Sequence, residues 1–193
     1  ATYDYFLSEH NRDSYDNEGD TLRVYTNSDA GFFNNGRTST DNAFWTSSIN
    51  ALILCKGGGT HASDDLVNID VVGHEVAHGV TRASADLRYR MESGALNESF
   101  SDIFGTMVEF YKEGAAGDYQ IGEDVWRSGK LRDMADPNSR WQPDTYGGGF
   151  WIDTKNCIPS PFSNDGCGVH TNSGVQNFWF YLLSEGGSGI NDL

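Results

Sequence analysis

The feature that most constrains this chain is the pattern H-E-x-x-H, which runs from His74 to His78. On a helix, His74 and His78 lie one turn apart on one face, with roughly 5 to 6 Å between their Cβ atoms, so both imidazoles can reach one metal ion. Glu75 lies beside that face, where its carboxylate can contact a metal-bound water without being a ligand. The alternative is a pair of structural histidines on an ordinary amphipathic helix, but so specific a pattern favours a metal site.

A catalytic zinc site takes three protein ligands and keeps one position open, so the pattern requires a third ligand. In one class of such sites, that of the metzincins, a glycine follows the second histidine by three residues and a third histidine follows three residues later. Those positions hold Thr81 and Ser84 in this chain. A third histidine from the same segment is therefore excluded.

The other source of a third ligand is a carboxylate from a following helix. A helical pattern covers residues 96–111, and Glu98 lies near its start. Glu98, Asp102 and Glu109 share one face of this helix, opposite an apolar face. An acidic face is often merely solvated, but beside the histidine motif it indicates a metal ligand with supporting groups.

Further motifs occur along nearly the whole chain. They are HEVAHGVT (74–81), SGALNESFSDIFGTMVEFY (93–111), IGEDVW (121–126), LRDMADP (131–137) and GVHTNSGVQNFWFYLL (168–183), with ATYDY at the start and DNAFW at 41–45. In these motifs the sequence resembles the thermolysin family of zinc neutral metalloproteases. The resemblance implies a zinc-dependent endopeptidase that cleaves on the amino side of bulky hydrophobic residues, with Glu75 as general base for a metal-activated water.

The resemblance also implies a role for each residue that matches a family motif. Zinc would be held by His74, His78 and Glu98, and the two histidines would be supported by Asn97 and Asp102. The other catalytic residues would be Tyr89, His170 and Asp165, which orients the imidazole of His170. The substrate backbone would be bound by Asn42, Ala43 and Arg132, beside an apolar pocket of Val71, Ile121 and Leu131. The alternative for Arg132 is a surface salt bridge.

A calcium site is a further implication of the resemblance. The matching ligands are Asp70, Glu109, Asp118 and Glu123, with the backbone carbonyl of Gln120. Carboxylates gathered in this way repel one another unless a hard cation neutralises them, and calcium accepts six to eight oxygen ligands. The chain departs from the family pattern at 112–117, so we expect one ion. The alternative is a solvated acidic surface.

The charge balance constrains the partners. The chain has 13 Lys and Arg against 28 Asp and Glu, a formal net charge of −15. Binding to a phosphate backbone requires a basic surface, so nucleic acid is not an expected partner. No apolar run approaches the roughly 18 residues of a membrane-spanning helix, so no membrane is expected either. The resemblance implies a secreted, extracellular enzyme that acts on protein or peptide substrates, and we expect a monomer.

The three cysteines allow one disulfide at most. Cys157 and Cys167 bracket a short loop that contains prolines and a glycine, which favours a bond between them in an oxidising compartment. Cys55 follows the apolar run ALIL and is predicted to be a buried free thiol. No C-x-x-C spacing occurs, so the cysteines are not expected to bind zinc.

The expected fold class is α+β. Residues 1–69 are rich in turn formers and predict short strands at 21–26, 43–48 and 51–56, with one helix at 2–10. Helices are predicted at 70–83, 95–112 and 175–184. By resemblance, residues 1–69 would belong to a β-rich amino-terminal lobe that packs on central zinc-binding helices in 70–112. Residues 113–193 would form calcium and cleft loops and the start of a carboxy-terminal helical lobe that is largely absent.

Two other functions stay open from the sequence. An exopeptidase of related zinc chemistry would need a group that captures the free amine or carboxylate of its substrate, and no motif for such a group is present. The chain could also be a catalytically inert piece of a larger protease. Assaying the protein for peptide cleavage separates this second alternative from the endopeptidase.

Overall fold

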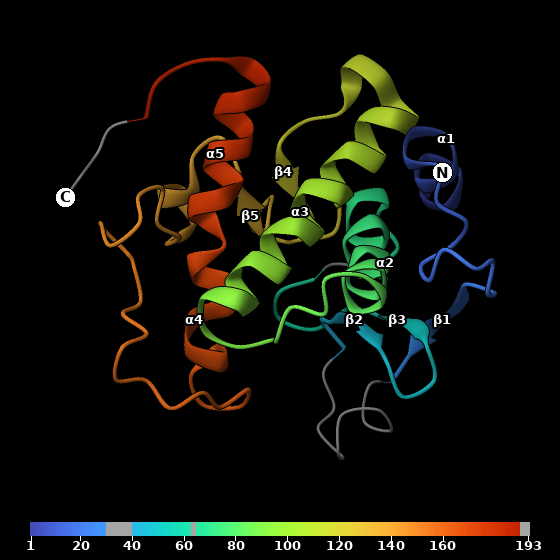
Figure 1. Ribbon diagram of the computed structural model, residues 1–193, viewed down its shortest axis with the longest axis horizontal. Coiled ribbons are helices and arrows are strands. Elements are labelled where there is room, and N and C mark those ends of the chain that lie inside the picture. The colour runs from blue at the N-terminus through green and yellow to red at the C-terminus, as the bar shows by residue number, and fades with distance from the viewer. Residues whose placement is uncertain (30–39, 63–64, 190–193) are drawn as a thin grey trace.

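Two crossing helices occupy the centre of the computed structural model, which describes residues 1–29, 40–62 and 65–189 (Figure 1). They are α2 (Ile69–Ala83) and α3 (Met91–Glu113). The side chain of Asn68 accepts a hydrogen bond from the backbone N–H of Ile69 at 2.7 Å and caps the start of α2. Both predicted helices are confirmed, although α3 begins four residues before the predicted position.

The two central helices approach each other through glycines. A Cβ atom on Gly105 of α3 would lie 2.5 Å from the carbonyl oxygen of Asp70 in α2. A Cβ atom on Gly73 of α2 would lie 2.9 Å from the Cα of Gly105. Only residues without a Cβ permit this contact. The crossing therefore sets how far the residues that follow Gly73 lie from α3.

Three short strands form a sheet in the order β1 (Arg23–Ser28), β3 (Ala51–Cys55) and β2 (Ala43–Thr46). β3 pairs parallel with β1 and antiparallel with β2. The apolar run of β3 is buried at every residue. β2 contacts α2 and keeps one edge that pairs with no other strand in the described part of the chain.

The predicted strands are confirmed with ends that differ by at most two residues, and β1 starts two residues later than expected. Asp20 explains the shift, because its carboxylate accepts hydrogen bonds from the hydroxyl of Tyr15 at 2.6 Å and from the backbone N–H of Thr21 at 2.8 Å. These bonds hold the residues before Arg23 in a loop.

The main core lies between the sheet, α2, α3 and the amino-terminal helix α1 (Thr2–His10). Tyr5 and Phe6 of α1 are buried there, which confirms the predicted helix. Trp45 of β2 packs against the same core, and a Cβ atom on Gly79 of α2 would lie 2.8 Å from its ring. Phe44 packs on the other side of the sheet, against Ile53 and Cys55. Both aromatics therefore fix β2 in place.

The carboxy-terminal half consists of short elements around α3. These are η1 (Gly114–Ala116), β4 (Gln120–Ile121), β5 (Arg132–Asp133), η2 (Pro137–Arg140), α4 (Asp165–Asn172) and α5 (Gly174–Glu185). β4 and β5 pair antiparallel, and α5 runs beside α3 (Figure 1). The predicted helix at 175–184 is confirmed as α5.

The start of α4 is a left-handed turn. Gly166, Cys167 and Gly168 have φ angles of 59°, 71° and 80°. A disulfide joins Cys157 to Cys167 and ties this turn to the preceding loop, as predicted. Cys55 is a buried free thiol, which is also confirmed. The mixture of helices with a small sheet confirms the α+β class, and none of the described helices is long and apolar enough to cross a bilayer.

Candidate metal centre and substrate cleft

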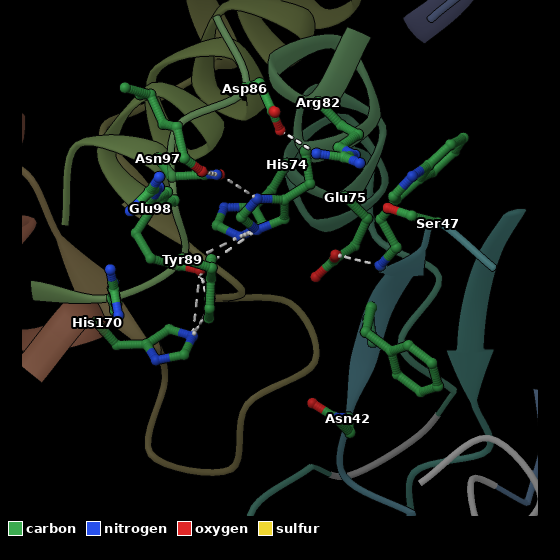
Figure 2. A pocket seen from close by; sticks show the side chains of 17 residues that line it. Asn42, Ser47, His74, Glu75, Arg82, Asp86, Tyr89, Asn97, Glu98 and His170 are labelled. Carbon is green, nitrogen blue, oxygen red and sulfur yellow. Dashed lines mark hydrogen bonds and ion pairs between the residues drawn. The ribbon is translucent and has the colours of Figure 1, made fainter. Parts of the chain in front are cut away.

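Three side chains from α2 and α3 converge on one point. The Nε2 atoms of His74 and His78 are 3.0 Å apart. The carboxylate oxygens of Glu98 lie 3.3 Å from Nε2 of His78 and 3.5 Å from Nε2 of His74 (Figure 2). A tetrahedral zinc ion with bonds of about 2.0 to 2.1 Å separates its ligand atoms by roughly 3.3 Å. The three groups are therefore spaced as zinc ligands are.

The other ring nitrogen of each histidine, Nδ1, forms a hydrogen bond with a residue of α3. Nδ1 of His74 donates to Oδ1 of Asp102 at 2.8 Å, and Nδ1 of His78 donates to Oδ1 of Asn97 at 2.7 Å. When the imidazoles are neutral, these bonds leave the lone pair of each Nε2 directed at the common point. The structure thus brings Asn97 and Asp102 into hydrogen-bond contact with the two histidines.

Glu98 is ready to bind a cation. Its side chain is fully buried, and Oε2 has no hydrogen-bond partner among the described residues. Burial raises the pKa of Glu98, but the positive charges of His170 and His78 outweigh burial and hold the pKa well below its usual value. Two imidazole nitrogens and one ionised carboxylate form a set of donors that suits zinc.

Asp102 connects the metal centre to the rest of the structure. Arg132 donates to it from two nitrogens at 2.7 and 2.6 Å, and Nδ2 of Asn177 in α5 donates at 2.8 Å. Burial raises the pKa of Asp102, but Arg132 outweighs burial and lowers it to about 2. Arg132 is buried as well, so its interpretation as a surface salt bridge is wrong.

Sequence reasoning missed two residues that support the histidines. Asn177 holds Asp102 and accepts a hydrogen bond from Ser99 at 2.7 Å. Its signal was a pair of neighbouring amides, Gln176 and Asn177, in the otherwise apolar run VQNFWFYLL. Ser101 places its hydroxyl 3.1 Å from Nδ1 of His78. Nothing in the local sequence distinguishes this serine from others on α3.

Glu75 and β2 line one cavity of about 880 Å³, which we call the large cavity. Oε2 of Glu75 accepts a hydrogen bond from the backbone N–H of Trp45 at 2.9 Å, so the carboxylate is fixed between α2 and the edge of the sheet (Figure 2). Asn42 and Ala43 line the same cavity. An acid, the three converging groups and a strand edge thus face one space.

Tyr89 and His170 stand on the other side of the converging groups. The hydroxyl of Tyr89 contacts Glu98 and lies 3.0 Å from Nε2 of His170. Nδ1 of His170 is 2.5 Å from Oδ1 of Asp165, whose second oxygen accepts from the backbone N–H of His170 at 2.9 Å. Burial lowers the pKa of His170, but the charges of Glu98 and Asp165 outweigh burial and raise it. The left-handed turn of α4 brings Asp165 and His170 together.

A second cavity, of about 270 Å³, adjoins the first, and we call it the apolar cavity. The three residues predicted to form an apolar pocket, Val71, Ile121 and Leu131, all line it. Arg132 and His170 also reach it. The apolar cavity shares Asn42, Ala43, His74, Glu75 and His170 with the large cavity. A bound chain could therefore pass from one cavity to the other beside Glu75.

A second cluster consists of acids alone. Oxygens of Glu109, Asp118 and Glu123 lie within 4.8 Å of one another. One buried oxygen of each glutamate has no hydrogen-bond partner among the described residues. Burial and the charge of Glu123 raise the pKa of Glu109 to about 8, and burial and the charge of Asp70 raise the pKa of Glu123 to about 7. The repulsion that raises both pKa values is the kind that a bound cation relieves.

Asp70 and Gln120 lie beside these three acids. Asp70 accepts hydrogen bonds from the backbone N–H groups of Val71 at 2.7 Å and Gly122 at 2.5 Å, and burial raises its pKa to about 6. The backbone N–H and side-chain amide of Gln120 both donate to Asp118, at 2.6 and 2.9 Å. Asp70 lies outside the tight group of three acids, although its charge reaches both glutamates.

Two family models match this chain in sequence. "Thermolysin metallopeptidase, catalytic domain" matches residues 1–82, and "Thermolysin metallopeptidase, alpha-helical domain" matches residues 85–192. Together they cover almost the whole chain.

Individual relatives agree with the family models. The chain is 39% identical to bacillolysin of Bacillus cereus, over 97% of this chain and 30% of the relative. It is 40% identical to a thermolysin of Alicyclobacillus acidocaldarius subsp. acidocaldarius, over 97% of this chain and 31% of the relative. The solved precursor of protealysin, a metalloproteinase from Serratia proteamaculans, has a TM-score of 0.70 at 32% identity and covers 95% of this chain and 56% of its own. The chain thus spans about three tenths of these curated relatives.

Proposed function

Because this chain belongs to the thermolysin family of metallopeptidases, we propose that it carries the zinc centre and cleft of a secreted endopeptidase. The proposed reaction is hydrolysis of peptide bonds on the amino side of bulky hydrophobic residues. The observation that carries the proposal is the convergence of His74, His78 and Glu98 at a cavity that also holds Glu75. The formal charge of −15 supports substrates other than nucleic acid, and we propose a monomer.

The proposed zinc ligands are His74, His78 and Glu98. When bound, zinc supplies a Lewis acid that polarises the scissile carbonyl and lowers the pKa of a water molecule. Asn97 and Asp102 fix the orientation of the two imidazoles. Arg132 holds Asp102 in turn, so the positions of the ligands depend on α2, α3 and β5 together.

Glu75 is the proposed general base. Its carboxylate accepts a proton as the water oxygen adds to the carbonyl carbon, and it then delivers this proton to the amide nitrogen while the C–N bond breaks. The hydrogen bond from Trp45 to one carboxylate oxygen restrains the group at the cavity wall. The other oxygen is available to the water.

Tyr89 and His170 are the proposed donors to the oxyanion that forms on the carbonyl. Both side chains lie beside the proposed zinc ligands, and the raised pKa of His170 favours its protonated form. Asp165 positions His170 through two hydrogen bonds. Because these donors are in place before the carbonyl oxygen becomes charged, they act without reorganising.

The proposed substrate binds as an extra strand. The edge of β2 that pairs with no other strand in residues 1–29, 40–62 and 65–189 can pair with an extended peptide through the backbone of Ala43 and the side chain of Asn42, with Arg132 as a further donor. The side chain that follows the scissile bond enters the apolar cavity. Bulky apolar residues fit there because Val71, Ile121 and Leu131 line it.

Mapping of cleavage sites tests this function directly. An unfolded protein is digested by the zinc-loaded protein, and the products are identified by mass spectrometry. We expect new amino termini that begin with bulky hydrophobic residues. Sequential loss of single terminal residues indicates an exopeptidase instead, and the absence of zinc-dependent cleavage indicates an inert fragment.

The His170→Ala variant is expected to lower kcat by roughly 10² to 10³, as removal of one transition-state donor does, with little change in KM. Steady-state kinetics on one peptide measure both constants. His10→Gln, a change to an exposed histidine on α1, serves as control and is expected to retain parental kinetics. A collapse of affinity at undiminished kcat makes His170 a binding residue and contradicts its proposed role.

We also propose one calcium ion at Glu109, Asp118 and Glu123, with Asp70 and the carbonyl of Gln120 as further ligands. The support is the two buried carboxylate oxygens without partners and the raised pKa values of the glutamates. Calcium has the affinity for oxygen and the flexible coordination that such a cluster needs.

The proposed site predicts that calcium stabilises the protein. A ligand that binds only the folded form adds about 2.7 kcal/mol at a hundredfold excess over its Kd. Tm is therefore expected to rise with calcium at constant zinc and ionic strength. Glu109→Gln is expected to flatten this dependence, whereas Glu113→Gln at the exposed end of α3 is not. A parent protein whose Tm ignores added calcium after complete removal of the ion refutes the site.

A further inference from the structure

One wall of the large cavity concentrates positive charge. The last turn of α2 contributes Arg82 to this wall, and the segment between α2 and α3 contributes Arg88 and Arg90. These are three of only 13 Lys and Arg residues in a chain of net charge −15. The composition of so acidic a protein does not explain this concentration of positive charge.

Arg82 is already neutralised. Its guanidinium pairs with the carboxylate of Asp86, four residues later, and both groups are exposed. Figure 2 shows this pair at the end of the cavity opposite to Asn42. Exposed pairs at this spacing are common on helical segments and contribute little energy. Arg82 is therefore not available to a ligand without loss of its partner.

Arg88 and Arg90 differ from Arg82 in having free guanidinium groups. Both side chains are exposed, and neither has a carboxylate within 4.0 Å in residues 1–29, 40–62 and 65–189. Their backbone is fixed, because the hydroxyl of Ser93 donates to the carbonyl of Arg88 at 2.7 Å and to that of Arg90 at 2.9 Å. Two unpaired cations thus project from an anchored segment. We call Arg88 and Arg90 the basic wall.

Tyr89 lies between these two arginines in the sequence, and its contacts show where they lie relative to the proposed catalytic groups. Its hydroxyl contacts Glu98 and His170. If the residue after the scissile bond occupies the apolar cavity, the residues before the bond must continue into the large cavity. An extended peptide spans about 10 Å in three residues. The basic wall therefore faces the three residues that precede the cleaved bond.

We propose that Arg88 and Arg90 form a subsite that selects substrates with Asp or Glu among the three residues before the scissile bond. This inference rests on the proposed endopeptidase function and adds a second requirement to it. A guanidinium binds a carboxylate through charge and through paired hydrogen bonds, whereas an amide of equal size offers no charge. The preferred substrate has an acidic side chain upstream and an apolar one downstream of the bond.

The test compares matched peptides. Each peptide carries the same leucine after the scissile bond and either Glu or Gln at one of the three preceding positions. For at least one position, we expect kcat/KM to be roughly threefold to tenfold higher for Glu, the range for one or two partly exposed ion pairs. The preference is expected to fall towards one as ionic strength approaches 1 M, where the Debye length is about 3 Å.

Variants assign the preference to the basic wall. The double change Arg88→Gln with Arg90→Gln is expected to bring the Glu-to-Gln ratio close to one. Arg88→Glu with Arg90→Glu is expected to reverse the selection, so that Lys at the same position is preferred over Gln. Lys112→Gln with Lys155→Gln removes two exposed charges elsewhere and is expected to keep the parental ratio.

The outcomes separate this inference from the proposed function. Equal kcat/KM for Glu and Gln peptides at all three positions overturns the subsite while the endopeptidase stands. A preference that survives both arginine double variants also overturns it. If no peptide is cleaved, including the neutral ones, the proposed function fails and the subsite fails with it.

Discussion

The Glu75→Gln variant is expected to bind zinc as the parent does and to lose roughly 10³-fold or more in kcat. General bases contribute about 10² to 10⁴ to rate, and an amide cannot accept the proton of the attacking water. Glutamine keeps the size of the side chain, and its carbonyl oxygen can still accept the hydrogen bond from Trp45. The cavity and the neighbouring histidines are therefore expected to stay in place.

The measurement combines peptide kinetics with zinc content. Glu113→Gln on α3, which lies outside both cavities, controls for loss of one negative charge. Equal activity of Glu75→Gln and parent rejects Glu75 as the base. Loss of zinc from Glu75→Gln makes Glu75 part of the metal site and contradicts the division of roles between Glu75 and Glu98.

Glu98→Ala is expected to lose the metal itself. The change removes the only carboxylate among the three converging groups and leaves two imidazoles. Loss of a group behind a zinc ligand already weakens affinity by about 10- to 100-fold, so loss of a ligand is expected to cost more than about 10²-fold. Elemental analysis after exhaustive dialysis reads zinc per protein, and circular dichroism reports whether the helices remain.

The Glu98→Gln variant distinguishes the loss of an oxygen donor from the loss of negative charge as the cause of the lost zinc. Glutamine retains an oxygen donor without the negative charge, so intermediate zinc content is expected. Asp102→Asn tests the neighbouring support, because it keeps the size of the group that accepts from His74. One zinc ion per molecule in Glu98→Ala shows that the third ligand lies elsewhere and overturns the assignment.

The helices and the converging groups were predictable because their signals are local. The spacing of His74 and His78 follows from helix periodicity, and α2 and α5 begin and end within one residue of their predicted limits. The thermolysin-like α+β fold, implied by resemblance, is confirmed by the family matches and by the protealysin precursor. The division into three segments and the roles of the site residues stay predictions.

The burial of Arg132 and the part played by Asn177 were not predictable. Both depend on contacts with Asp102, which lies 30 and 75 residues away in the chain. No local periodicity reports such a contact. The left-handed turn at Cys167 was not predictable from the sequence for a different reason. A positive φ at a non-glycine residue runs against ordinary backbone preference.

The glycine contact between α2 and α3 bears on the precision of the metal centre. His74 follows Gly73 directly, and Glu98 precedes Gly105 by two turns of helix. Contacts between side chains have alternative rotamers, each with its own spacing, whereas a contact between two backbones has none. The distance between His74 and Glu98 is therefore set by the backbone contact between the two helices α2 and α3. In this protein the accuracy of a site rich in functional groups derives from two residues that have no side chain at all.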